Sequence, residues 1–218
     1  MDPTPFVSVL EYLGVVAFAI SGALLAEHKR MDLVGVVVFA TVVSVGGGTI
    51  RDILLGQLPV FWIDDPIFIV VGAMTALITL PLAKSGTIDL LRRFRIISLA
   101  DAAGLAAFTV VGTGMALDVG ASGLAAISVG IASGIGGGVV RDVLASRVPE
   151  ALSDGRLYAT AALMGALTYV VMLELGLSEF VTVWAAIAVI IGIRVLSIGF
   201  GVRVPTVTIP EEKLGSRS

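Results

Sequence analysis

The sequence has no cysteine, a single histidine and few charged residues. Without cysteine, the chain cannot form a disulfide, a thiol nucleophile or a thiolate metal site. Because His28 is the only histidine, one chain cannot build a multi-histidine metal site either. Asp, Glu, Lys and Arg make up 14% of the 218 residues, compared with about 25% in a typical soluble domain. This scarcity of charge indicates a chain that does not fold in water.

The sequence also lacks the motifs of common enzyme classes. It has no Gly-x-Ser-x-Gly elbow, no zinc-ligand set, no P-loop and no nucleotide-binding fingerprint. An ATP-driven pump is therefore excluded for this chain alone. We expect a protein that is not an enzyme, with no cofactor and no nucleic-acid partner.

Apolar residues are what the sequence has in abundance. They make up 57% of the chain, and the mean hydropathy is +1.04. A helix needs roughly 20 apolar residues to cross a bilayer, and seven apolar runs are close to that length. These candidate spans cover residues 6–26, 33–56, 66–83, 96–117, 121–145, 155–175 and 180–200. The sequence therefore predicts an all-α integral membrane protein with seven transmembrane helices, built as a single membrane domain over residues 1–218.

Lysine and arginine are confined to one side of this arrangement. The loops and tail that follow the first, third, fifth and seventh spans hold eleven of them, and the loops on the other side hold none. The eleven are Lys29, Arg30, Lys84, Arg92, Arg93, Arg95, Arg147, Arg156, Arg203, Lys213 and Arg217. The positive-inside rule then predicts a multi-pass plasma-membrane protein with its N-terminus outside and its C-terminus in the cytoplasm.

A stretch of the sequence occurs twice. Residues 45–59 read VGGGTIRDILLGQLP, and residues 135–149 read IGGGVVRDVLASRVP. The offset of 90 holds upstream, where Glu11 corresponds to Asp101. We predict two three-helix repeats, at residues 6–90 and 96–180, followed by an unpaired seventh helix at 180–200 and a flexible tail at 201–218. Three spans are an odd number, so the second repeat is expected to be inverted in the membrane, as in many transporters.

Triple glycines lie near the middle of the second and fifth spans. They are Gly46, Gly47, Gly48, Gly136, Gly137 and Gly138. Glycine is a poor helix former, so we expect these spans to kink there and to serve as a hinge or a pore lining. Any monovalent cation site is expected near the kinks, with ligands that the sequence does not identify. The alternative is close helix packing, because small residues let helices approach.

An arginine–aspartate pair follows each glycine run: Arg51 with Asp52, and Arg141 with Asp142. Charges inside a membrane are costly and usually functional. Helical neighbours point about 100° apart and do not face each other, so each charge is expected to meet a partner on another span, within or across the repeats, or water. The pairs are interpreted either as structural clamps at helix ends or as charges at the mouths of a polar path.

Two acids lie inside the first and fourth spans, Glu11 and Asp101. A buried carboxylate needs a partner or water, and we predict that Glu11 or Asp101 reaches an arginine of the opposite repeat. Arg194, in the last span, is expected to extend its side chain to the cytoplasmic face.

The paired motifs GGGTIRD and GGGVVRD, in a seven-span chain with two three-span repeats, resemble the prokaryotic branch of the trimeric intracellular cation (TRIC) channels. The likeness covers residues 6–200. It implies a homotrimer in which each protomer has its own pore, lined by the kinked second and fifth spans with the first and fourth. It also implies permeation by potassium and sodium, so the expected partners are these ions, membrane lipids and further copies of the chain.

A secondary transporter of glycine or another small zwitterion is the alternative function. Broken helices offer backbone N–H groups to a carboxylate, and carbonyl or acidic oxygens to an ammonium group. Arginine and aspartate near one site would suit both ends of an amino acid. Saturable, stereoselective uptake would favour this carrier over a passive channel.

Overall fold

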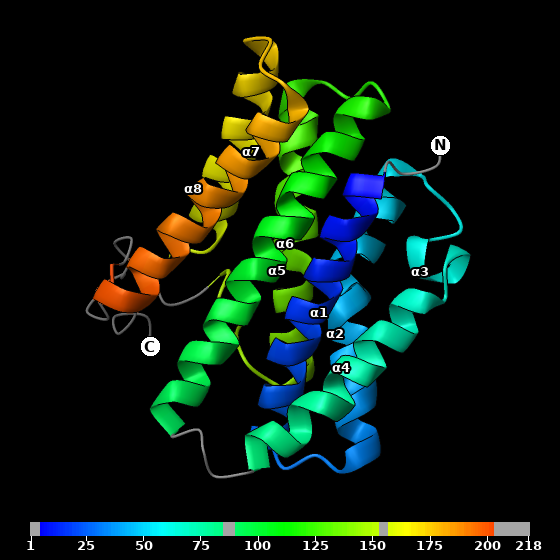
Figure 1. The fold of residues 1–218 in the computed structure, drawn as a ribbon, viewed down its shortest axis with the longest axis vertical. Coiled ribbons are helices and arrows are strands. Elements are labelled where there is room, and N and C mark those ends of the chain that lie inside the picture. Colours follow the sequence, from blue (N-terminus) through cyan, green and yellow to red (C-terminus); the bar gives the residue numbers. More distant parts are fainter. Residues whose placement is uncertain (1–4, 85–89, 153–156, 203–218) are drawn as a thin grey trace, which may run out of the picture.

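The computed structural model describes residues 5–84, 90–152 and 157–202, and the regular structure in these ranges is entirely helical. Seven helices have 16 or more residues, whereas α3 is a single turn (Figure 1). The elements are α1 (Pro5–His28), α2 (Leu33–Leu55), α3 (Phe61–Asp64), α4 (Ile67–Lys84), α5 (Leu90–Asp118), α6 (Gly123–Leu144), α7 (Ala159–Glu174) and α8 (Glu179–Phe200).

The all-helical prediction is confirmed, and each predicted span coincides with one long helix. Five of these helices, α1, α2, α5, α6 and α8, are long and apolar enough to cross a membrane. The apolar parts of α4 and α7 are shorter, Ile67–Leu82 and Ala159–Glu174, so a count of seven crossings stays a prediction. The sequence analysis did not predict α3, because four residues are too short for a periodic pattern.

Corresponding helices of the two repeats begin in the same way. Asp32 caps α2 by accepting a hydrogen bond from the Gly35 N–H at 2.7 Å. Ser122, 90 residues later, caps α6 by accepting from the Ala125 N–H at 3.4 Å. A side-chain oxygen at this position satisfies an N–H group that has no partner within the helix. The duplicated sequence therefore sets where both helices start.

Four helices form the centre of the bundle. α1 packs on α2 and α5, while α6 packs on α2 and α5, so each repeat contacts the other through two helices. α1 runs down from the N-terminal end in Figure 1 and α5 runs up, so these two helices are antiparallel. α4 covers α1 and α2, whereas α7 and α8 cover the side of α5 and α6. The most deeply buried charged residues lie on these four helices and on α8.

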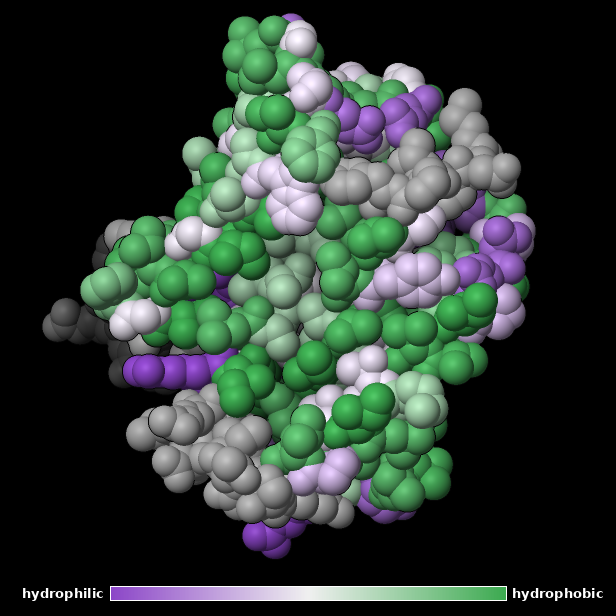
Figure 2. Space-filling view, in the orientation of Figure 1, coloured by the Kyte–Doolittle hydropathy of each residue, from purple (hydrophilic) through white to green (hydrophobic). Residues whose placement is uncertain are grey.

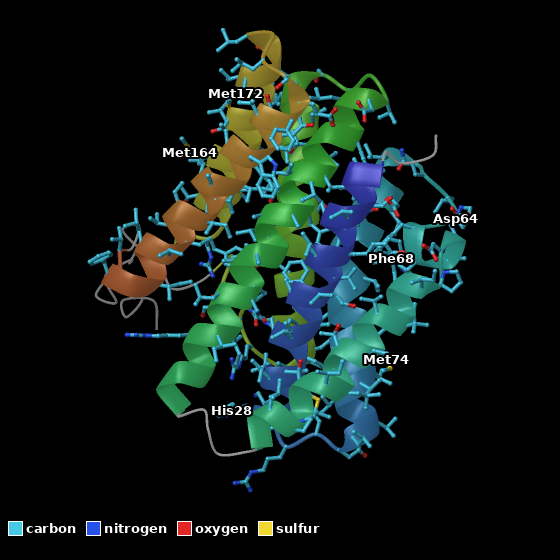
Figure 3. The ribbon with its side chains drawn as sticks, viewed as in Figure 1. His28, Asp64, Phe68, Met74, Met164 and Met172 are labelled. Carbon is cyan, nitrogen blue, oxygen red and sulfur yellow. The ribbon has the colours of Figure 1, made fainter. Side chains whose placement is uncertain are left out.

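The outer surface of the bundle is apolar. Figure 2 shows hydrophobic residues over most of the visible face, with hydrophilic ones gathered toward the ends and edges. Large exposed hydrophobic side chains such as Val38, Ile78 and Leu196 make up this surface, which is far more apolar than water tolerates. His28 lies near the lower end of the bundle in Figure 3, and Met172 lies near the upper end.

The chain is thus an integral membrane protein, as predicted. Which end faces the cytoplasm stays a prediction. Gly201, the first residue of the predicted tail, ends α8 in a left-handed conformation with a φ of 64°. Residues 203–218 of that tail lie outside the described part of the chain.

Candidate functional site

Glu11, Arg51 and Asp52 form a buried ionic cluster between α1 and α2, here called the repeat-one network. Arg51 Nη1 donates to Glu11 Oε1 at 2.5 Å, and Arg51 Nε donates to Asp52 Oδ1 at 2.7 Å. All three residues are at most 3% exposed. One guanidinium is therefore shared by two carboxyl groups, and its planar donors satisfy both.

The repeat-one network also holds the loop that follows α2. Asp52 Oδ2 accepts a hydrogen bond from the Phe61 N–H at 2.7 Å, which fixes the first residue of α3. The Arg51 guanidinium lies over the Phe61 ring, 5.4 Å from its centroid. Both ionisable residues of α2 thus contact the same short helix, which packs on α2 and α4.

Asp101, Arg141 and Asp142 form the corresponding repeat-two network between α5 and α6. Arg141 Nη1 donates to Asp101 Oδ1 at 2.7 Å, and Arg141 Nε donates to Asp142 Oδ1 at 3.0 Å. Asp142 Oδ2 accepts from the Glu150 N–H at 3.0 Å and so holds the loop after α6. Since α1 and α5 are antiparallel, the two networks lie toward opposite ends of the bundle.

The predicted pairing between repeats is wrong. Glu11 pairs with Arg51 and Asp101 with Arg141, so each acid meets the arginine of its own repeat. The reason is that the first two long helices of each repeat pack directly against each other, which places residues 40 apart in sequence at the same depth. The adjacent arginine and aspartate also contact each other, although each arginine has a second carboxylate partner as expected.

Two hydrogen bonds do join the repeats. Arg141 Nη1 donates to Ser21 Oγ at 2.7 Å, and Ser133 Oγ donates to the Gly47 carbonyl at 3.3 Å. Ser21, Ser133 and Gly47 are all buried in the centre. Each of these two polar contacts between the repeats therefore uses a serine hydroxyl and not a pair of opposite charges.

Arg194 and Tyr158 belong to the same end as the repeat-two network, and the sequence analysis did not place them there. The Tyr158 hydroxyl donates to Asp101 Oδ1 at 3.0 Å. The Arg194 guanidinium stacks on the Tyr158 ring, 4.4 Å from its centroid, and its Nη2 lies 3.5 Å from Asp101 Oδ2.

The prediction that Arg194 reaches the cytoplasmic face is therefore wrong, because the residue is 0% exposed. Its three nitrogens make no hydrogen bond to any described residue, and Asp101 Oδ2 has none either. The available signal was a lone arginine in an apolar span, which by default indicates a buried partner.

The triple glycines lie where α2 and α6 cross. A Cβ built on Gly136 would stand 3.1 Å from the Gly47 Cα, and one on Gly47 would collide with the Ser133 carbonyl oxygen. Gly137 lies under the Phe18 ring, while Gly48 and Gly138 lie under Phe61 and the Tyr158 hydroxyl. These glycines therefore permit close packing, the alternative set out from the sequence.

Both glycine helices are continuous. α2 and α6 run through their glycines without interruption, so neither backbone unwinds there, and a kink or hinge stays a prediction. The Gly47 carbonyl accepts from Ser133.

Among the described residues, no three or more His, Cys, Asp or Glu side chains are grouped so that they could hold a metal ion. A monovalent cation site near the glycines also stays a prediction.

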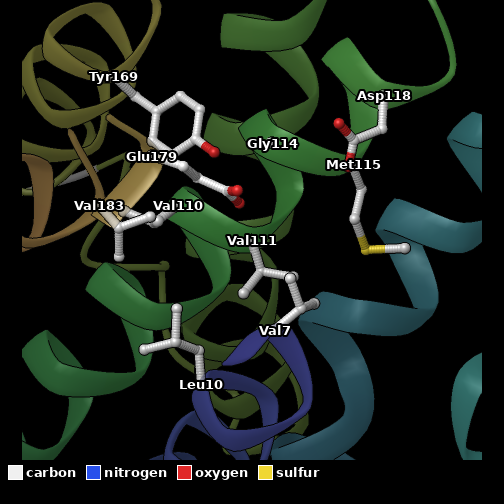
Figure 4. Close-up of a pocket in the computed structure, with 10 residues that line it drawn as sticks. All are labelled: Val7, Leu10, Val110, Val111, Gly114, Met115, Asp118, Tyr169, Glu179 and Val183. Atoms are coloured by element: carbon white, nitrogen blue, oxygen red, sulfur yellow. The ribbon is translucent and has the colours of Figure 1, made fainter. Parts of the chain in front are cut away.

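A separate small pocket lies where α1 begins and α5 ends (Figure 4). Valine and leucine make up half of its lining residues, and Asp118, Tyr169 and Glu179 contribute its polar groups. None of the residues of the two networks lines this pocket. It is therefore distinct from the buried charges at the centre of the bundle.

The family model described as "Glycine transporter" matches residues 8–84 and again residues 98–174, so the same model fits the chain twice at an offset of 90. The UPF0126 inner membrane protein YadS of Escherichia coli K12 is 41% identical over 162 residues, which is 73% of this chain and 75% of that protein. A UPF0126 membrane protein of Vibrio cholerae is 37% identical over 205 residues, covering 93% and 83%.

Solved structures of ion channels share this fold. The TRIC trimeric intracellular cation channel orthologue from Rhodobacter sphaeroides superposes with a TM-score of 0.84 at 34% identity, covering 90% of this chain and 99% of its own. A prokaryotic TRIC channel in 0.5 M KCl gives a TM-score of 0.85 at 29% identity, covering 91% and 98%. The likeness extends over the whole helical bundle and is not limited to the glycine motif.

Proposed function

The chain belongs to the prokaryotic TRIC family, which includes the UPF0126 membrane proteins, and from this membership we propose that it forms a passive cation channel. The observation that carries the proposal is the pair of buried ionic networks, one toward each end of the bundle. Charged groups at this depth are costly in a membrane protein, and where they occur they pair with one another and commonly mark a path for ions or water. A path between α1, α2, α5 and α6 would pass both networks.

The arginines of the networks do not rule out cations. An arginine beside a pore would raise the barrier for a cation, but Arg51 and Arg141 each contact two carboxyl groups. The repeat-one network has two acids for one arginine, so its formal charge favours cations over anions. Potassium and sodium are the proposed permeant ions, on the strength of the likeness to the TRIC cation channels, one of which was solved in 0.5 M KCl.

The charged residues at the end of the bundle where α3 lies also favour cations. The described acids at that end of the bundle are Asp64, Asp65, Asp118, Glu174 and Glu179. No lysine or arginine is found in the loops there. A surface of one sign concentrates ions of the opposite sign, so this end would supply cations. We propose that it faces outward and that the C-terminus is cytoplasmic, in a homotrimer with one pore in each protomer.

Glycine transport is the second candidate, and the description of the matching family model favours it. A carrier needs polar groups that are free to bind an ammonium and a carboxylate. Here the carboxyl groups of Glu11, Asp52 and Asp142 are already engaged by arginines or backbone N–H groups, and substrate binding there would have to break those contacts. Asp101 Oδ2 and the Arg194 nitrogens make no hydrogen bond to a described residue, so a carrier would have to use these two groups.

Flux through liposomes distinguishes the two functions. Purified protein in vesicles should release trapped potassium at a rate that rises linearly with its concentration gradient and does not depend on glycine. Vesicles without protein provide the control. Glycine uptake that saturates and excludes larger amino acids, with no potassium release, would overturn the channel in favour of the carrier.

A further inference from the structure

Two phenylalanines occupy the centre of the bundle, midway between the ionic networks. Phe18 of α1 and Phe108 of α5 correspond at the 90-residue offset, and both are 0% exposed. Their rings stack with centroids 5.6 Å apart and an interplanar angle of 10°. An apolar pair therefore lies where the two repeats meet.

Each ring lies against glycines of the opposite repeat. A Cβ built on Gly104 or Gly137 would stand 2.6 Å from the Phe18 ring. In the same way, a Cβ built on Gly14 would stand 2.8 Å from the Phe108 ring, and one on Gly47 would stand 3.5 Å from it. At Gly14, Gly104 and Gly137, only glycine leaves room for the neighbouring ring.

The glycine runs therefore form part of the surface against which the two phenylalanine rings pack. One glycine of each triple run and one glycine of each neighbouring helix form the surface on which a ring rests. Because real Cβ atoms almost never come within 3.0 Å of another heavy atom, an alanine at Gly14, Gly104 or Gly137 would displace the ring. At Gly47 the added Cβ would meet the Phe108 ring at an ordinary distance and would collide with the Ser133 carbonyl oxygen instead. The duplicated glycines and the duplicated phenylalanines thus form one closed layer.

Polar groups stand on both sides of that layer. Glu11 is seven residues before Phe18, and Asp101 is seven residues before Phe108, which places each acid about 10 Å along its helix from the ring. Because α1 and α5 are antiparallel, the two acids lie on opposite sides of the phenylalanine pair. A third ring, Phe61, meets Phe108 edge-on at 6.5 Å and extends the apolar layer toward α3.

We propose that Phe18 and Phe108 form the hydrophobic gate of the ion path, held shut here by their fit onto the glycines of the opposite repeat. The proposal rests on the channel function proposed above. A cation cannot shed its water to cross stacked phenyl rings, and an apolar constriction stops ions by excluding water. Opening requires the rings to leave the glycines, which couples the gate to the α2–α6 crossing.

Truncation of either ring tests the gate. Wild type, Phe18→Ala and Phe108→Ala are recorded as single channels in planar bilayers under a potassium chloride gradient. We expect each alanine variant to raise the fraction of time open by about tenfold or more, because loss of a buried ring removes packing that only the closed arrangement has. The reversal potential should stay where it is in wild type, since the charges that select cations are untouched.

Phe39→Ala provides the matched control. Phe39 is another buried ring of the same core cluster, on α2, but it is not among the nearest neighbours of the four glycines. Its truncation should leave the open fraction close to that of wild type. If the alanine variants do not give monodisperse protein, Phe18→Leu and Phe108→Leu keep most of the volume and should raise the open fraction by a smaller factor.

The outcomes separate the gate from the channel. Wild-type currents with unchanged open fractions in the Phe18 and Phe108 variants, or an equal rise in Phe39→Ala, would overturn the gate and leave the channel standing. Absence of currents in every variant and in wild type would overturn the channel, and the gate with it. A rise confined to Phe18 and Phe108 supports both.

Discussion

The two ionic networks share an arginine–aspartate core but differ in what surrounds it. In repeat one, Arg51 pairs with Glu11 and Asp52, and the ring of Phe61 from α3 lies against its guanidinium. In repeat two, Asp101 pairs with Arg141, accepts a hydrogen bond from the Tyr158 hydroxyl and lies 3.5 Å from Arg194 of α8. The eighth helix has no counterpart in repeat one. It therefore supplies a second arginine to one end of the bundle only, and the duplicated halves are not equivalent.

Removal of the central arginine should expose this difference most strongly. We expect Arg51→Met to lower the free energy of unfolding by about 3–5 kcal/mol, because it leaves two buried carboxyl groups without their cation. Arg141→Met should cost less, about 1–3 kcal/mol, because Arg194 lies close enough to compensate Asp101. Unfolding of purified protein in detergent measures both. Arg147→Met, at an exposed site, is the control, and equal losses for Arg51 and Arg141 would contradict the compensation.

A double-mutant cycle sharpens the role of α8. Arg194→Met alone should change the free energy of unfolding by less than about 1 kcal/mol, because its nitrogens make no hydrogen bond and Asp101 keeps Arg141. In the Arg141→Met background the same change should cost about 2 kcal/mol more, since Asp101 then loses its last arginine. Additive losses would show that the two arginines do not share Asp101.

The glycine runs differ between repeats as well. A Cβ on Gly46 would meet a Val140 methyl group at 3.3 Å, whereas one on Gly136 would meet the Ile50 Cδ1 at 2.7 Å and the Gly47 Cα at 3.1 Å. Gly136→Ala should therefore lower the free energy of unfolding by about 1 kcal/mol or more. Gly46→Ala should cost less than about 0.5 kcal/mol, because alanine also favours the helix. The same unfolding assay checks the order of these two variants, and the reverse order would refute it.

The smallest effect is expected at the hydroxyl bridge between the repeats. Ser133 donates to the Gly47 carbonyl over 3.3 Å, and its counterpart in repeat one is Val43, which has no hydroxyl. Ser133→Ala should therefore lower the free energy of unfolding by only about 0.5 kcal/mol. A loss of more than about 2 kcal/mol would mean that this bond, and not the glycine packing, holds α2 against α6.

Sequence analysis anticipated the parts of this architecture that depend on local pattern. Apolar runs located all seven long helices, and the 90-residue offset matched Glu11 with Asp101 and Arg51 with Arg141. It failed where the answer depends on which helices become neighbours. The pairing of Glu11 with Arg51 follows from the α1–α2 contact, and the burial of Arg194 follows from α8 docking onto α5 and α7. Nothing within the apolar run of α8 specifies that docking.

The central claim is that the chain is a passive path for monovalent cations through each protomer. The measurement that tests it most directly is the reversal potential of unitary currents from purified protein in a planar bilayer, under a potassium chloride gradient. We predict a reversal near the potassium equilibrium potential for wild type. In Asp52→Asn the reversal should move toward zero, because the repeat-one network loses a negative charge. A reversal near the chloride potential, or no unitary current at all from protein that is folded, would contradict the account.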